Sequence, residues 1–151
     1  MVKLTELGHI LVRVLDLERS KKFYKDVLGF TILEEDPEHG GTFLSLPGQS
    51  HCIDLFQTKD LDVAQRQTPG VRGLGHIAFR VASEADLKEA SDSLRAHGVE
   101  ILRTIDHVSQ KSIYFEDPDG NTLEIYYELP DALEMFARGR NDRDVSISLD
   151  R

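Results

Sequence analysis

Two histidines and one glutamate occupy positions from which they could hold a metal ion. His9 lies in Gly-His-Ile-Leu-Val-Arg-Val (residues 8–14), and His76 lies in Gly-His-Ile-Ala-Phe-Arg-Val (residues 75–81). Five of these seven positions are identical, at an offset of 67 residues. Glu124 lies in a later apolar segment. Two imidazoles and one carboxylate leave open positions on an octahedral ion, which suits Fe(II), while Mn, Co, Ni and Zn accept the same donors.

A second carboxylate falls at a position that matches Glu124. The segment Cys-Ile-Asp-Leu-Phe (52–56) aligns with Thr-Leu-Glu-Ile-Tyr (122–126), so that Asp54 corresponds to Glu124 at an offset of 70 residues. Its side chain is one methylene shorter than that of glutamate. Asp54 is therefore a candidate fourth ligand, a partner that orients a ligand histidine, or a solvent-facing residue, and the sequence leaves these alternatives open.

The elements that position these residues repeat in the same order. The two histidine segments alternate and read as strands. Each is followed by a helix with a cap before it and a glycine after it, from Asp16 to Gly29 in the first half and from Ser83 to Gly98 in the second. Three short strands then follow each helix, at about 30–35, 41–46 and 51–57, and at about 99–105, 111–116 and 122–128.

This order predicts an α+β fold made of two pseudo-symmetric βαβββ modules in a single domain, residues 1–151. The expected boundaries are about 5–57 for module 1, about 58–73 for a polar linker and about 74–128 for module 2. A C-terminal helix and tail occupy 129–151. Within this last segment, 130–137 can form a short helix, and the charged residues 139–151 predict a mobile tail.

Composition excludes several classes of protein. The chain has 18 basic and 27 acidic residues, a net charge of −9, which argues against a nucleic-acid partner because binding phosphates needs clustered Lys and Arg. No apolar run approaches the about 20 residues that cross a bilayer, so no membrane partner is expected. The N-terminus lacks the apolar core of a signal peptide, which predicts a cytoplasmic protein. The single cysteine, Cys52, rules out an internal disulfide.

Several motifs resemble the vicinal-oxygen-chelate superfamily over about residues 5–128. They are Gly8-His9-Ile10, Phe23-Tyr24 with Val27-Leu28-Gly29-Phe30, Gly75-His76-Ile77 and Phe115-Glu116-Asp117-Pro118-Asp119-Gly120-Asn121. That superfamily holds glyoxalase I, fosfomycin-resistance thiol transferases, bleomycin-binding proteins, methylmalonyl-CoA epimerase and type I extradiol dioxygenases. The resemblance implies an open barrel around a metal, a homodimer, and His9, His76 and Glu124 as the metal ligands.

A second resemblance concerns the reaction. Residues 106–115, from Asp106 to Phe115, are similar to a region of small ring-cleaving dioxygenases. It implies an Fe(II)-dependent extradiol dioxygenase of aromatic catabolism, with a catechol-type diol and O2 as substrates. His107 would then be the catalytic acid/base, and Tyr126 would hydrogen-bond a substrate hydroxyl. The sequence departs from the pattern at one point, because the relatives carry one more residue, usually glycine, between the histidine and Val-Ser, whereas Val108 follows His107 directly.

Three other functions stay open. A glyoxalase I-like enzyme uses a carboxylate of the first module, normally Glu, where this chain has Asp54. A fosfomycin-type thiol transferase needs a cation-lined pocket, for which Arg13 and Arg80 are candidates on the histidine face. A drug-binding protein without catalysis would suit the net charge of −9, but the intact set of His9, His76 and Glu124 argues against it.

Overall fold

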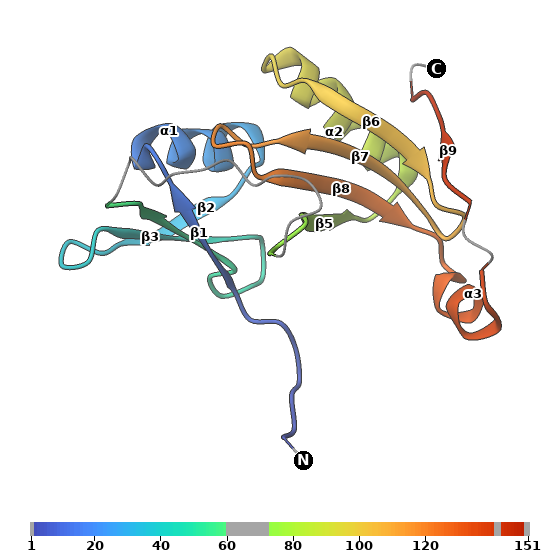
Figure 1. Ribbon diagram of the computed structural model, residues 1–151, viewed down its shortest axis with the longest axis horizontal. Coiled ribbons are helices and arrows are strands. Elements are labelled where there is room, and N and C mark those ends of the chain that lie inside the picture. The colour runs from blue at the N-terminus through green and yellow to red at the C-terminus, as the bar shows by residue number, and fades with distance from the viewer. Residues whose placement is uncertain (1, 60–72, 141–142, 150–151) are drawn as a thin grey trace. The chain divides into compact units, whose positions relative to one another are not determined.

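The computed structural model describes residues 2–59, 73–140 and 143–149. The chain divides into two compact units, Met1–Arg66 and Gln67–Arg151 (Figure 1). The linker predicted at 58–73 falls almost entirely on residues 60–72, which lie outside the described residues. Each unit contains one β-sheet, which confirms the predicted α+β class.

The first unit is a four-stranded sheet with one helical segment. Its strands lie in the order β1-β4-β3-β2, with β1 and β4 parallel and the other pairs antiparallel. Asp16 caps the helix, because its Oδ1 accepts a hydrogen bond from the Arg19 amide at 3.0 Å. The regular helix gives way to a π-helix where one continuous helix was expected, and the adjacent rings of Phe23 and Tyr24 are both buried there. The elements are β1 (Ile10–Val14), α1 (Leu17–Lys22), η1 (Phe23–Val27), β2 (Thr31–Glu35), β3 (Gly41–Ser45) and β4 (Ile53–Gln57).

The second unit repeats this topology and adds one strand. Its order is β5-β8-β7-β6-β9, again with the first pair parallel. Ser83 caps the long helix through its Oγ, which accepts from the Asp86 amide at 3.1 Å. The elements are β5 (Ile77–Val81), α2 (Glu84–Ala96), β6 (Ile101–Asp106), β7 (Gln110–Glu116), β8 (Thr122–Glu128), α3 (Ala132–Arg138) and β9 (Val145–Ser146).

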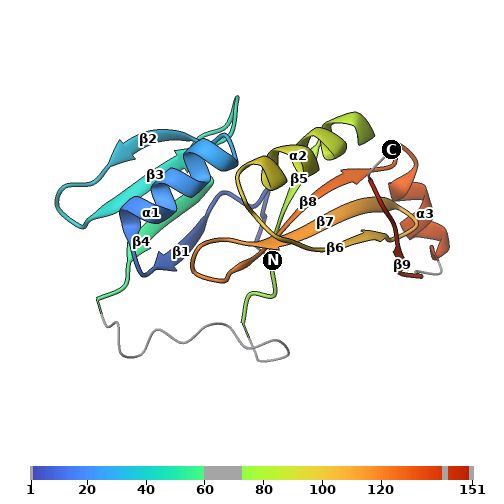
Figure 2. The same ribbon diagram turned by 90° about the horizontal axis from the view of Figure 1, so that it is seen from above.

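The two sheets match in register as well as in order. Pairing shifts at one residue between Ile32 and Glu34 in the first sheet, and between Ile101 and Arg103 in the second. Each sheet buries one face beneath its helix (Figure 2), with Leu55 in the first core and Leu123 in the second. Neither sheet closes on itself, so the barrel implied by the resemblance is not formed by either unit alone.

The C-terminal tail contains a short strand, whereas a mobile segment is expected over 139–151. Val145 and Ser146 form β9, which pairs antiparallel with Asp106 and Ile105 of β6. An edge strand presents unpaired backbone groups that another segment can satisfy, and the tail does so here. Among the described residues, no helix combines the length and the apolar character that spanning a membrane requires.

Candidate metal centre

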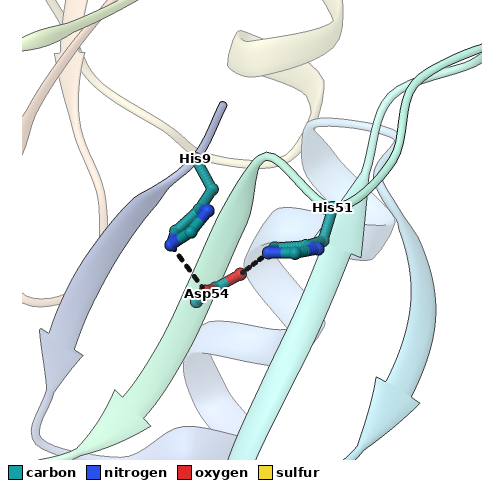
Figure 3. Close-up of side chains that lie close together, drawn as sticks. All are labelled: His9, His51 and Asp54. Atoms are coloured by element: carbon teal, nitrogen blue, oxygen red, sulfur yellow. Dashed lines mark ion pairs between the residues drawn. The ribbon is translucent and has the colours of Figure 1, made fainter. Parts of the chain in front are cut away.

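The first unit gathers two histidines around one carboxylate (Figure 3). His9 immediately precedes β1, and Asp54 lies in the neighbouring parallel strand β4, opposite Leu11. His9 Nε2 is 3.6 Å from Asp54 Oδ2, and His51 Nε2 is 3.8 Å from Asp54 Oδ1. The two imidazole rings lie 4.7 Å apart between centroids. Within the part of the chain that the structure describes, this is the cluster of three or more such side chains whose donor atoms could hold a metal ion.

Asp54 is a buried carboxylate with an unsatisfied oxygen. The residue is 4% exposed, and its Oδ1 accepts no hydrogen bond from any residue that the structure describes. Leaving a buried acceptor unpaired costs about 1–3 kcal/mol, and more when the group is charged. A cation beside Asp54 would remove this cost, so the donor set of two imidazoles and one carboxylate fits a transition-metal ion.

The second unit brings His76 and Glu124 together. His76 Nε2 lies 3.0 Å from Glu124 Oε2, and Gln110 Nε2 donates to Glu124 Oε1 at 2.9 Å. Tyr114, directly opposite Glu124 on β7, also hydrogen-bonds this carboxylate. Burial, together with the negative charge of Glu124, raises the pKa of the Tyr114 phenol to about 12. Tyr114 therefore stays a neutral hydroxyl at physiological pH and can donate a hydrogen bond.

His107 extends this set of contacts away from Glu124. Its Nε2 lies 3.0 Å from the Tyr114 hydroxyl, and its Nδ1 lies 2.6 Å from Asp144 Oδ1. A carboxylate only accepts hydrogen bonds, so Nδ1 carries a proton and donates to Asp144. Asp144 reaches this position because β9 pairs with β6. The result is a continuous series of contacts, from Asp144 through His107 and Tyr114 to Glu124.

The turn that carries His107 is held in an unusual conformation. Val108 has φ of +70°, and its amide donates to Asp106 Oδ1 at 2.8 Å. Arg140 braces the same turn by donating to the His107 carbonyl and to Ser109 Oγ, each at 2.9 Å. A β-branched residue in this left-handed region costs about 1–3 kcal/mol. The strain falls on the residue that directly follows His107.

The predicted site residues thus divide between the two units. The structure brings His9 to Asp54 and His76 to Glu124. That His9, His76 and Glu124 share one ion stays a prediction. Tyr126 lies on β8 on the same face as Glu124, and burial, followed by the charge of Glu128, raises the pKa of its phenol. Its contact with substrate also stays a prediction.

Two residues of these clusters, His51 and Tyr114, escaped the sequence analysis, as did Asp144 of the C-terminal tail. His51 was assigned to a strand from 51 to 57, where alternation would turn it away from Asp54, but β4 begins at Ile53 and His51 lies before it. Tyr114 lies in the segment 106–115, and the sequence alone assigns it no role. Its register opposite Glu124 depends on the length of the β7–β8 turn, and a count of residues back from Glu124 through the Asp-Pro-Asp-Gly turn could have found it.

Comparison with known proteins gives consistent matches. Residues 6–125 match the model of the Glyoxalase/Bleomycin resistance protein/Dioxygenase superfamily. The chain is 32% identical over 119 residues to biphenyl-2,3-diol 1,2-dioxygenase 3 of Rhodococcus globerulus, covering 79% of this chain but only 61% of that enzyme. It is 35% identical over 128 residues to the lactoylglutathione lyase of Haemophilus influenzae, covering 79% of this chain and 90% of that enzyme. A solved glyoxylase/bleomycin resistance protein/dioxygenase domain from Frankia superimposes with a TM-score of 0.73 at 24% identity, over 84% of this chain and all of that one, and shows the shared fold.

Proposed function

The chain belongs to the glyoxalase/bleomycin resistance protein/dioxygenase superfamily, and on that basis we propose that it is a metal-dependent extradiol dioxygenase acting on a catechol-type diol. The proposed ligands are His9, His76 and Glu124, with Fe(II) as the ion. The observation that carries the proposal is the series of contacts from His107 through Tyr114 to Glu124. It connects a histidine that can move protons to a carboxylate in the proposed metal site.

The ion and the protein residues contribute different chemistry. When bound, Fe(II) supplies a Lewis acid with open positions for two vicinal oxygens and for O2. His107 is the proposed acid/base, since histidine is the side chain that exchanges protons most readily near neutral pH. Asp144 fixes the imidazole with Nε2 toward Tyr114. Tyr114 keeps its proton and holds both Glu124 and His107 in place, while Tyr126 is proposed to bind a substrate hydroxyl.

The test is turnover after anaerobic reconstitution with Fe(II). The protein is offered a panel of catechols and then O2, and a yellow ring-fission product is followed. His107→Gln is expected to lower kcat by about 10²–10⁴-fold, the usual contribution of a positioned acid/base. His97→Gln is the matched control, because His97 ends α2 with its Nδ1 beside the Ser93 carbonyl. Full ring-cleaving activity in the His107 variant would refute the proposed role.

A glyoxalase-type reaction is the second candidate, and one observation favours it. Asp54 is buried beside His9, at the position where the resemblance to glyoxalase I implies a metal-binding carboxylate. The match to the lactoylglutathione lyase also covers 90% of that enzyme's length. A carboxylate at a metal can take a proton from a carbon next to a carbonyl. Turnover of the hemithioacetal of methylglyoxal and glutathione, without any catechol cleavage, would favour this candidate over the dioxygenase.

A further inference from the structure

We propose that the first unit binds a divalent transition-metal ion by itself, through His9, His51 and Asp54. This site goes beyond the proposed function, which combines His9 with two residues of the second unit. His9 binds one ion at a time, so the two sites compete for it. His51 is the new ligand, and nothing in the resemblance assigns it a role. The three residues lie on or near two paired parallel strands. Asp54 is in β4, His9 directly precedes β1, and His51 lies two residues before β4.

The distances between the donor atoms favour this site. The three ligand atoms all lie within 4.8 Å of one another. Metal–ligand bonds of about 2.0–2.2 Å place neighbouring donors about 3 Å apart. The two histidine-to-carboxylate separations, 3.6 and 3.8 Å, are already close to that value. Both imidazoles are partly exposed, with 50% of the His9 side chain and 36% of the His51 side chain accessible, so their rings can turn inward to bind.

The buried carboxylate is the second, independent observation. Asp54 is nine-tenths or more buried, and its Oδ1, the oxygen that faces His51, accepts no hydrogen bond within the described ranges 2–59, 73–140 and 143–149. The residue opposite Asp54 on β3 is Phe43, which offers no donor and packs its ring 5.5 Å from that of His51. Protonated imidazoles would satisfy the carboxylate only by placing two positive rings 4.7 Å apart. One shared ion satisfies all three groups, and two imidazoles with one carboxylate select a transition metal over Mg²⁺ or Ca²⁺.

The test uses the full chain with the second donor set removed. His76→Ala/Glu124→Gln protein, freed of metal, is titrated with Co(II) alone and followed by calorimetry and by the visible absorption of the bound ion. We expect one equivalent of Co(II) with a ligand-field spectrum. Adding His51→Ala should weaken binding at least 10-fold, because one of three protein donors is lost.

Two further variants keep this test decisive. His39→Ala is the matched control, since His39 pairs with Asp36 outside the cluster in the same unit, and Co(II) affinity should not change. Asp54→Asn should weaken Co(II) binding while leaving the metal-free protein at least as stable, because it removes the unpaired buried charge. The proposal is overturned if the His76/Glu124 double variant binds no Co(II), or if His51→Ala and His39→Ala bind it equally well.

The outcomes separate this inference from the proposed function. Catechol cleavage that requires His76 and Glu124, in a protein whose double variant binds no Co(II), would support the proposed function and overturn this site. Co(II) binding by the double variant that depends on His51, in a protein that cleaves no catechol, would support this site and overturn the proposed function.

Discussion

Asp54 and Glu124 occupy equivalent positions in the two units but differ in the hydrogen bonds that their carboxylates accept. Each lies on the last strand of its βαβββ repeat, opposite the strand that follows the histidine. Glu124 is contacted by His76, Gln110 and Tyr114, whereas one oxygen of Asp54 has no hydrogen bond to the part of the chain that the structure describes. Within the described residues, the chain thus satisfies the carboxylate of Glu124 more fully than that of Asp54.

A single hydroxyl accounts for much of this difference. The residue opposite Glu124 is Tyr114, and the residue opposite Asp54 is Phe43. The tyrosine hydroxyl connects Glu124 to His107. The phenylalanine ring instead packs against His51. The proposals of a proton-moving His107 in the second unit and of a metal site in the first both start from this difference.

Among the changes that test this difference between the two units, the largest effect is expected when the hydroxyl is removed from the second unit. Tyr114→Phe makes the position identical to that of Phe43 and breaks the connection between His107 and Glu124. We expect kcat for catechol cleavage to fall by about 10²–10³-fold. Combining it with His107→Gln should cost little more, because the two residues act as one unit. Steady-state kinetics with matched iron content measure this, and unchanged kcat would show that the hydroxyl has no catalytic part.

The pKa of Tyr114 predicts how the stability of the metal-free protein depends on pH. Its folded pKa of about 12 lies above the ordinary value of 10.0, so the unfolded chain loses this proton first as pH rises. The stabilisation is complete below pH 10 and is lost on going toward pH 12, by up to about 2–3 kcal/mol. Denaturant unfolding at several pH values should show a decline that is smaller in Tyr114→Phe. Equal declines in the two proteins would contradict the assigned pKa.

The reverse exchange sharpens the comparison from the other side. Phe43→Tyr places a hydroxyl opposite Asp54, where it can donate to the unpaired oxygen. The metal-free protein should become more stable by about 1 kcal/mol, the usual net value of a hydrogen bond. Co(II) affinity should fall by about 10-fold, because the ion must then displace that bond. Thermal unfolding and Co(II) titration measure both effects, and tighter Co(II) binding would count against the proposed site.

The smallest effect concerns the turn that carries His107. Val108→Gly relieves the strain of a positive φ at a β-branched residue, worth about 1–3 kcal/mol, and adds a backbone entropy cost of about 0.5–1 kcal/mol. The net expectation is a gain of about 1 kcal/mol in the free energy of unfolding, measured by denaturant titration. A loss of stability would mean that Val108 packing outweighs the strain.

The repeat made most of the fold predictable from the sequence. Alternating strands with a capped helix after the first recur with the same signals in both halves, so the strand at 122–128 was predicted with the bounds that β8 has. The contact of His76 with Glu124 follows from the same repeat, because parallel neighbours β5 and β8 direct equivalent side chains to one face.

The parts that escaped prediction depend on geometry between distant residues. His51 could be recognised only once β4 was known to begin at Ile53. Tyr114 acquires its role from the cross-strand register with Glu124. Asp144 reaches His107 because a charged tail pairs with an edge strand, and no local pattern in 139–151 indicates that pairing.

The most direct test of the proposed function is the fate of the two atoms of O2. Fe(II)-reconstituted protein is supplied with a catechol and isotopically labelled O2, and the ring-fission product is examined by mass spectrometry. An extradiol dioxygenase places both labelled atoms in one product molecule, and His107→Gln should slow its formation without changing that labelling. Recovery of intact catechol with no uptake of O2, from protein that holds its full complement of iron, would contradict the dioxygenase assignment.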